Sequence, residues 1–217
     1  MLGWGTARLM AARSSHAGAG YGWRMPRRIT TILGHISEES YCGELHRAYA
    51  GAAVAAGHEV RQIMLPRLGF DPILREAYRR QMPLEPDLVL AQEAIVWAEH
   101  LVFVYPTWWG QQPALLRGFV DRTFLPGWAF KYRENSPWWD RLLAGRSARL
   151  IVTMGAPPWY DLLVYRGSSR RAMKKAVLEF CGVKPVGVTA IGPVRHSTPE
   201  WRQRWIGRVA ELGRAGE

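Results

Sequence analysis

The sequence predicts one α/β domain, residues 25–217, built on a five-stranded parallel sheet with helices on both faces. From residue 29 onward, short runs of branched apolar residues alternate with longer segments whose apolar residues recur at helical spacing. The chain has 217 residues, 48% of them apolar, which is enough to fill a core of this size. Strands that alternate with helices form parallel sheets with right-handed crossovers.

Three strands, two helices and a long loop are predicted in the first half of the chain. Each strand is a short apolar run bounded by polar or turn-forming residues. The first helix keeps its apolar residues on one face and ends at Gly57. The second helix also has a single apolar face, which runs from Leu88 to Ala98. The segment between them is rich in proline, which favours a surface loop. In order, the elements are strand 29–34, helix 39–56, strand 58–65, loop 66–86, helix 87–99 and strand 102–105.

The same alternation continues to the end of the chain. Its elements are helix 113–124, strand 150–154, helix 169–181, strand 186–191 and helix 199–212. The expected spatial order of the five strands is 2-1-3-4-5. In such sheets, ligands bind outside the carboxyl ends of the strands, near the switch point between strands one and three.

Composition predicts a cytoplasmic protein. Residues 1–24 are rich in Gly, Ala, Ser and Arg, lack the apolar core of a secretion signal, and are expected to form a flexible extension before Met25. No apolar run approaches the roughly 20 residues that span a bilayer. Cys42 and Cys181 form no close-spaced pair, so neither a disulfide framework nor a metal site is suggested.

The chain is strongly basic, with 29 Lys and Arg residues against 18 Asp and Glu residues and a net charge of +11. Such a charge is compatible with nucleic acid, an acidic membrane surface or a phosphorylated ligand. No nucleic-acid-binding module accompanies it, so nucleic acid is not an expected partner. Most of the basic residues are expected to form solvated faces.

Three loops leave the carboxyl ends of the strands, at 35–42, 105–112 and 153–161. In the first, Ser37 or Ser40 is placed to cap the following helix, and free N–H groups at a helix N-terminus bind phosphate. The other two carry large aromatic residues, Trp108 and Trp109 in one and Trp159 and Tyr160 in the other. Aromatic surfaces that face a phosphate site fit a flat ring system carrying a phosphate, such as a flavin.

Three stretches resemble the flavodoxin-like NAD(P)H:quinone oxidoreductase family, which includes DT-diaphorase, the modulator-of-drug-activity proteins and the potassium-efflux ancillary flavoproteins. They are HISEESYCGEL, FVYPTWWGQQPALLRGFVDRTFLPGWAF and VTMGAPPWYDLLVYRG. The resemblance covers 28–194 and implies a flavodoxin-like fold. It also implies cofactor-binding roles for His35, Ser37, Ser40, Tyr41, Cys42, Gln92, Pro106, Thr107, Trp108, Trp109, Gly110, Thr153, Met154, Gly155, Ala156 and Tyr160.

Two residues are catalytic candidates on the same resemblance. Tyr160 matches a tyrosine whose hydroxyl faces the flavin ring, and is expected to donate a hydrogen bond to the reduced flavin or the acceptor. Arg166 stands where relatives such as DT-diaphorase carry a histidine, so it either offsets charge on the flavin or is a surface residue. Relatives also have Thr-Gly-Gly where this chain has residues 154–156. One of the two tryptophans at 108 and 109 is expected to pack in the core.

The implied activity is a ping-pong exchange in which a flavin takes a hydride from NAD(P)H and then passes two electrons to a quinone or a similar flat acceptor. A short phosphate loop favours FMN, with FAD as the alternative. Arg166, Arg170 and Arg171 favour NADPH over NADH. A homodimer that buries part of the Trp-rich segment 126–139 is expected. The alternative functions are a regulatory flavoprotein subunit of a membrane transporter and an azo- or nitroreductase.

Overall fold

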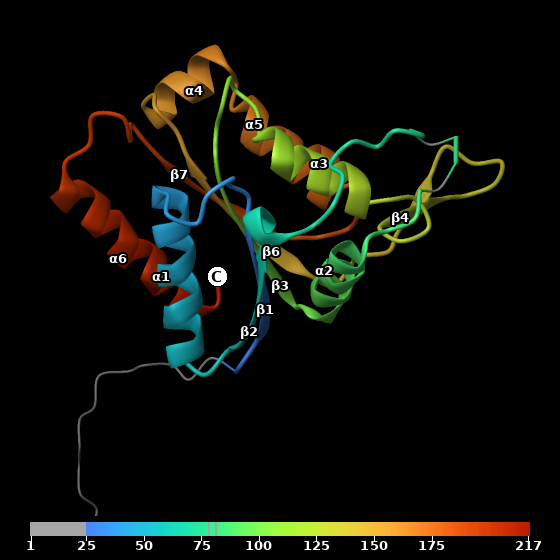
Figure 1. The fold of residues 1–217 in the computed structure, drawn as a ribbon, viewed down its shortest axis with the longest axis horizontal. Helices are drawn as coiled ribbons and strands as arrows, with labels where there is room; N and C mark the ends of the chain where they lie inside the picture. The colour runs from blue at the N-terminus through green and yellow to red at the C-terminus, as the bar shows by residue number, and fades with distance from the viewer. Residues whose placement is uncertain (1–24, 78, 81) are drawn as a thin grey trace, which may run out of the picture.

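The computed structural model describes residues 25–77, 79–80 and 82–217, so the predicted extension at 1–24 lies outside the described residues. The strands are β1 Arg28–Leu33, β2 Glu59–Met64, β3 His100–Pro106, β4 Phe130–Tyr132, β5 Trp139–Arg141, β6 Ser147–Thr153 and β7 Val186–Ile191. The helices are α1 Tyr41–Ala55, the 3₁₀ turn η1 Leu65–Arg67, α2 Pro86–Trp97, α3 Ala114–Thr123, α4 Pro158–Val164, α5 Ser168–Arg171, the π-helical η2 Ala172–Leu178 and α6 Pro199–Ala215. Figure 1 shows their arrangement.

Five strands form one parallel sheet in the order β2-β1-β3-β6-β7, which confirms the predicted order. The register places Ile32 of β1 opposite Ile63 of β2 and Phe103 of β3. All seven residues of β3 are buried, as expected for the central strand of a sheet covered on both faces. The carboxyl ends of β1, β3 and β6 therefore meet at one edge of the sheet.

Helices cover both faces of the sheet (Figure 1). On one face α1 and α6 pack over a core that includes Leu45, Tyr49 and Val209. On the other face α2, α3 and η2 pack over a larger core that includes Leu88 and Phe119. No helix in the described part of the chain combines the length and the apolar character needed to cross a membrane.

Three segments differ from the prediction. Residues 126–139 contain β4 and the start of β5, an antiparallel pair whose strands have three residues each, too few for periodicity to reveal. The predicted loop 153–161 ends in α4, whose start is marked by Pro158 at a position where proline is favoured. The helix predicted at 169–181 begins as α5 and continues with the wider turns of η2.

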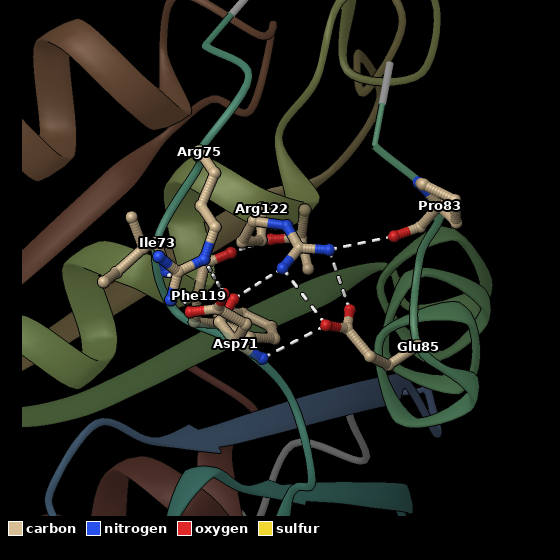
Figure 2. A network of polar contacts seen from close by, with 8 residues as sticks. Asp71, Ile73, Arg75, Pro83, Glu85, Phe119 and Arg122 are labelled. Carbon is tan, nitrogen blue, oxygen red and sulfur yellow. Dashed lines mark hydrogen bonds and ion pairs between the residues drawn. The ribbon is translucent and has the colours of Figure 1, made fainter. Parts of the chain in front are cut away.

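A buried arginine organises the long loop between β2 and α2 (Figure 2). Arg122, at the end of α3, is only 1% exposed. Its guanidinium donates to the carbonyl oxygens of Asp71 and Pro83, at 2.5 and 2.9 Å, and to the carboxylate of Glu85, at 2.8 Å for the shorter contact. Burial alone would raise the pKa of Glu85, but hydrogen bonds from the Asp71 amide and Arg122 hold it below its usual value. The predicted loop 66–86 is thus tied to the helix layer.

Two buried histidines are expected to make the fold sensitive to acid. Burial lowers the pKa of His46 to about 4 and that of His100 to about 3. Unfolded histidines bind a proton below about pH 6.5 and these folded ones do not, so the free energy of unfolding falls as the pH drops from 6.5 toward 4. His46 alone should account for roughly 3 kcal/mol of this loss. Urea unfolding at pH 7 and pH 4.5 measures it.

The control for this prediction is a histidine in solvent. His46→Met should flatten the pH dependence of unfolding by more than His196→Gln, a substitution at an exposed position. An identical pH slope in His46→Met and the wild type would show that His46 is not the group responsible.

Candidate functional site

Two contacts join the three predicted loops at the carboxyl edge of the sheet. The Thr107 N–H, just after β3, donates to the carbonyl oxygen of Thr153 at the end of β6, at 2.7 Å. The Thr153 hydroxyl lies 3.2 Å from the thiol of Cys42, in the first turn of α1. The predicted residues at 35–42, 106–110 and 153–155 are therefore brought to one place.

The N-terminus of α1 has the free N–H groups that an anion site requires. Ser40 is the N-cap, and its hydroxyl accepts from the Gly43 N–H at 3.2 Å, whereas Ser37 accepts from the Glu39 N–H. The N–H groups of Tyr41 and Cys42 have no acceptor among the described residues. Free N–H groups and the helix dipole favour a phosphate there.

Gly43 lets the loop close onto the helix. An added Cβ at this position would lie 1.9 Å from the carbonyl oxygen of Glu38, far inside any contact distance. Glu38 is in turn held by a two-point ion pair with Arg67 of η1, and its carbonyl oxygen accepts from Arg47. The hydrogen bond from Arg67 is the main reason that the pKa of Glu38 is lowered. The backbone around the anion site is therefore tightly packed.

The second loop turns sharply over this helix end. Trp108 and Gln111 exchange two backbone hydrogen bonds, at 3.0 and 2.9 Å. Trp109 and Gly110, between them, both have positive φ, 51° and 70°, as a type I′ turn requires. The Trp108 ring meets the His35 ring edge to face at 5.6 Å, and the Nδ1 atom of His35 accepts from the Ser37 N–H. The first two loops thus share one aromatic contact.

A cleft of about 430 Å³ opens between the second and third loops. Its lining is Pro106, Thr107, Trp108, Trp109, Thr153, Met154, Gly155 and Val194. Trp108 is 40% exposed and Trp109 is fully exposed, so the expectation that one tryptophan packs in the core is wrong. Both indoles are held out of the core because the turn places them beyond the end of β3.

The polar groups around the cleft fit a flavin. The Thr107 hydroxyl oxygen is buried and has no hydrogen-bond partner among the described residues. The backbone N–H groups of Gly155 and Ala156 likewise have no acceptor there. The Thr107 hydroxyl and these N–H groups leave hydrogen-bonding positions open beside an aromatic cleft, which suits a ligand with both flat and polar parts.

Burial keeps the Cys42 thiol and the Tyr41 phenol neutral at the start of α1. The pKa of the Cys42 thiol is raised to about 12, and that of Tyr41 is also raised to about 12. Cys42 is therefore a neutral thiol and not a nucleophile. The Tyr41 hydroxyl donates to the carbonyl oxygen of Arg202, and the Arg202 guanidinium lies 5.9 Å from the Tyr41 ring. Tyr41 thus ties α1 to α6, with the Arg202 guanidinium beside its ring.

Three predicted residues lie outside this set of contacts. Gln92 is on α2, on the opposite face of the sheet from α1, and its amide donates to the carbonyl oxygen of Thr123. Tyr160 packs edge to face against Trp159 and Tyr165, at 5.9 and 5.8 Å. Arg166 is exposed and has a positive φ of 53°. Their roles in cofactor binding and catalysis stay predictions.

Sequence reasoning missed three residues of the site. Val194 lines the cleft although it lies 38 residues beyond the third loop's Ala156, and it is placed there because its N–H donates to the carbonyl oxygen of Met154. Gln112 and Ser168 connect the second loop to the start of α5. Nothing local in the sequence marks these contacts, which depend on how the chain packs.

Residues 27–211 match the model of a family described as having a flavodoxin-like fold. The chain belongs to this family. The resemblance found in the sequence is thereby confirmed. A relative from Penicillium crustosum, named a ribosyldihydronicotinamide dehydrogenase-like protein, is 30% identical over 65% of this chain and 62% of its own length. NAD(P)H dehydrogenase (quinone) 1 of Rattus norvegicus is 23% identical over 81% of this chain and 72% of its own length.

A solved structure extends the match over the whole domain. The NAD(P)H:quinone oxidoreductase from Methanothermobacter marburgensis superposes with a TM-score of 0.74 at 26% identity, over 88% of this flavodoxin-like chain and 100% of its own. The chain spans only 62% of the length of the Penicillium relative.

Proposed function

We propose that this flavodoxin-like protein is a flavin-dependent NAD(P)H oxidoreductase that transfers two electrons to quinones or similar flat acceptors. The observation that carries the proposal is the joining of an anion-binding helix end and an aromatic cleft through Thr153, which contacts both. The names of the relatives support the same reaction class. A flavin would supply the chemistry by accepting a hydride from NAD(P)H and passing two electrons on.

Each group of residues at the site would have its own role in binding or catalysis. The free N–H groups of Tyr41 and Cys42 would bind the phosphate, and Trp108 and Trp109 would provide the walls for the ring. The N–H groups of Gly155 and Ala156 would stabilise negative charge at the polar edge of the ring. One helix end with one phosphate site favours FMN, and FAD remains the alternative.

The hydride donor is proposed to be NADPH. Arg166 and Arg171 are exposed beyond the third loop, where they would meet an additional phosphate. Arg170 is not available to bind this phosphate, because its guanidinium forms an ion pair with the buried carboxylate of Asp161 at 3.0 Å. Of the three arginines predicted to favour NADPH, Arg166 and Arg171 therefore remain as candidates. The net charge of +11 would also steer an anionic donor toward the protein.

A homodimer is proposed on the basis of exposed apolar surface. In α4, Trp159, Leu162 and Leu163 are 62, 56 and 72% exposed, and Trp138 beside β5 is 66% exposed. Patches of this kind mark interaction surfaces. The predicted burial of segment 126–139 against a partner agrees with the exposed position of Trp138. Analytical ultracentrifugation would measure the mass in solution.

Steady-state kinetics would test the proposed function. The protein loaded with FMN is expected to be yellow and to oxidise NADPH faster than NADH in the presence of a quinone. If the protein binds neither FMN nor FAD, the proposed flavin mechanism is wrong. Flavin binding without turnover on any quinone, azo or nitro acceptor would favour the regulatory alternative, a flavoprotein subunit of a membrane transporter.

Tyr160→Phe is expected to lower kcat about tenfold without changing flavin affinity, because a hydrogen bond to the reacting groups contributes roughly 1.4 kcal/mol. Tyr165→Phe is the matched control, since Tyr165 contacts the Tyr160 ring and its hydroxyl has no predicted role. Equal kcat values for the two variants would remove Tyr160 from the mechanism.

A further inference from the structure

Two pairs of residues with left-handed backbone lie in the second loop and just before α5. Trp109 and Gly110 have φ values of 51° and 70°, and Arg166 and Gly167 have values of 53° and 60°. Glycine adopts this conformation freely, but a non-glycine residue there is strained and persists only when its surroundings hold it. The structure must therefore contain contacts that hold Trp109 and Arg166.

Two reciprocal hydrogen bonds connect the segments that contain these pairs. The Ser168 hydroxyl donates to the carbonyl oxygen of Gly110 at 2.5 Å, and the Gln112 amide donates to the carbonyl oxygen of Ser169 at 2.7 Å. Each bond runs from a side chain of one segment to the backbone of the other. We call these two bonds the 112–168 clip. The clip joins the turn that carries Trp109 to the helix start that follows Arg166.

The side chain that the strained turn presents makes no packing contribution to the fold. Trp109 is fully exposed, and a type I′ turn normally takes Asn or Gly at its position. Stability alone would select a different residue. An indole held in solvent at the lining of a cleft is instead suited to stack on a flat ring.

We propose that Gln112 and Ser168 are positioning residues that hold Trp109 over the cleft so that it stacks on the flat acceptor. The inference rests on the proposed function, because it assigns the clip to acceptor binding in that same site. It adds a specificity determinant that lies outside the cleft lining. Loss of the clip should weaken binding of flat aromatic acceptors and leave the chemical step and the anion site at α1 unchanged.

Kinetics with 1,4-naphthoquinone as the probe would test the clip. Ser168→Ala is expected to raise the KM about fivefold with kcat within about twofold of the wild type, because one hydrogen bond contributes about 1 kcal/mol. Gln112→Met should act in the same direction. Ser168→Thr keeps the hydroxyl and should restore the KM. Flavin affinity, measured by fluorescence quenching, should change less than the KM does, because the phosphate site at the start of α1 is not touched by these substitutions.

A double-mutant cycle separates positioning from a merely structural brace. Trp109→Ala should raise the KM by itself, and adding Ser168→Ala to it should produce no further rise if the clip acts through Trp109. Additive effects on KM, or a lowered melting temperature with an unchanged KM, would overturn the inference. Hydrogen exchange of the Gln111 amide supplies a readout apart from turnover, and it should be faster in Ser168→Ala by about fivefold.

The same measurements distinguish the two proposals. If the wild type binds no flavin and reduces no acceptor, the proposed function fails and the clip has no acceptor to position. If the wild type is active but Ser168→Ala matches it in KM and in exchange at Gln111, only the clip inference fails.

Discussion

Gly43→Ala is expected to weaken flavin binding by more than tenfold, which corresponds to at least about 1.4 kcal/mol of binding free energy. The added Cβ would lie 1.9 Å from the carbonyl oxygen and 2.7 Å from the carbonyl carbon of Glu38. Both are backbone atoms, so the loop has to move as a unit. The movement would pull Ser40 from its capping position and reorient the free N–H groups of Tyr41 and Cys42. Fluorescence quenching of FMN by the apoprotein measures the Kd.

The matched control lies two turns further along the same helix. An added Cβ at Gly51 would meet no atom within 4 Å, so Gly51→Ala should retain flavin affinity and stabilise the helix by roughly 0.5–1 kcal/mol. The two substitutions are chemically identical and differ only in what surrounds them. Equal Kd values for Gly43→Ala and Gly51→Ala would contradict the assignment of the anion site to this helix end.

Periodicity predicted the sheet because every strand of it has at least six residues and is covered by a helix. The strand 186–191 was predicted with the bounds that β7 has, and the expected strand order is that of the structure. The pair β4 and β5 escaped prediction because three residues carry no period. The short helix α4 escaped because the aromatic residues around Trp159 had been interpreted only as loop surface.

The part of the candidate site that lies at the carboxyl ends of the strands could be predicted from the sequence. His35, Trp108 and Gly155 each follow a strand, and a parallel sheet brings such residues together whatever the intervening sequence. The 112–168 clip was not predictable, because its bonds join residues 57 and 58 positions apart. One of Trp108 and Trp109 was expected in the core, and the exposure of that one was missed, since large apolar residues are usually buried.

Arg122→Met is expected to lower the free energy of unfolding by about 3 kcal/mol, the lower end of the range for removing one member of a buried ion pair, because the Glu85 side chain is 29% exposed. The guanidinium is 1% exposed and serves three acceptors on the loop between β2 and α2. Methionine fills much of the same volume and donates no hydrogen bond. The carbonyl oxygens of Asp71 and Pro83 and the carboxylate of Glu85 would then lose their partner.

A second arginine on α3 provides the comparison that makes this prediction sharp. Arg117 pairs with Asp121 at 2.7 Å, but its side chain is 53% exposed, so Arg117→Met should change the free energy of unfolding by less than about 1 kcal/mol. Adding Glu85→Gln to Arg122→Met should recover part of the loss, because the carboxylate would no longer be a charge without its cation. Urea unfolding at pH 7 of the wild type, the two single variants and the double variant measures these changes in the free energy of unfolding. A loss for Arg122→Met no larger than that for Arg117→Met would mean that the loop is held by its apolar contacts and not by the arginine.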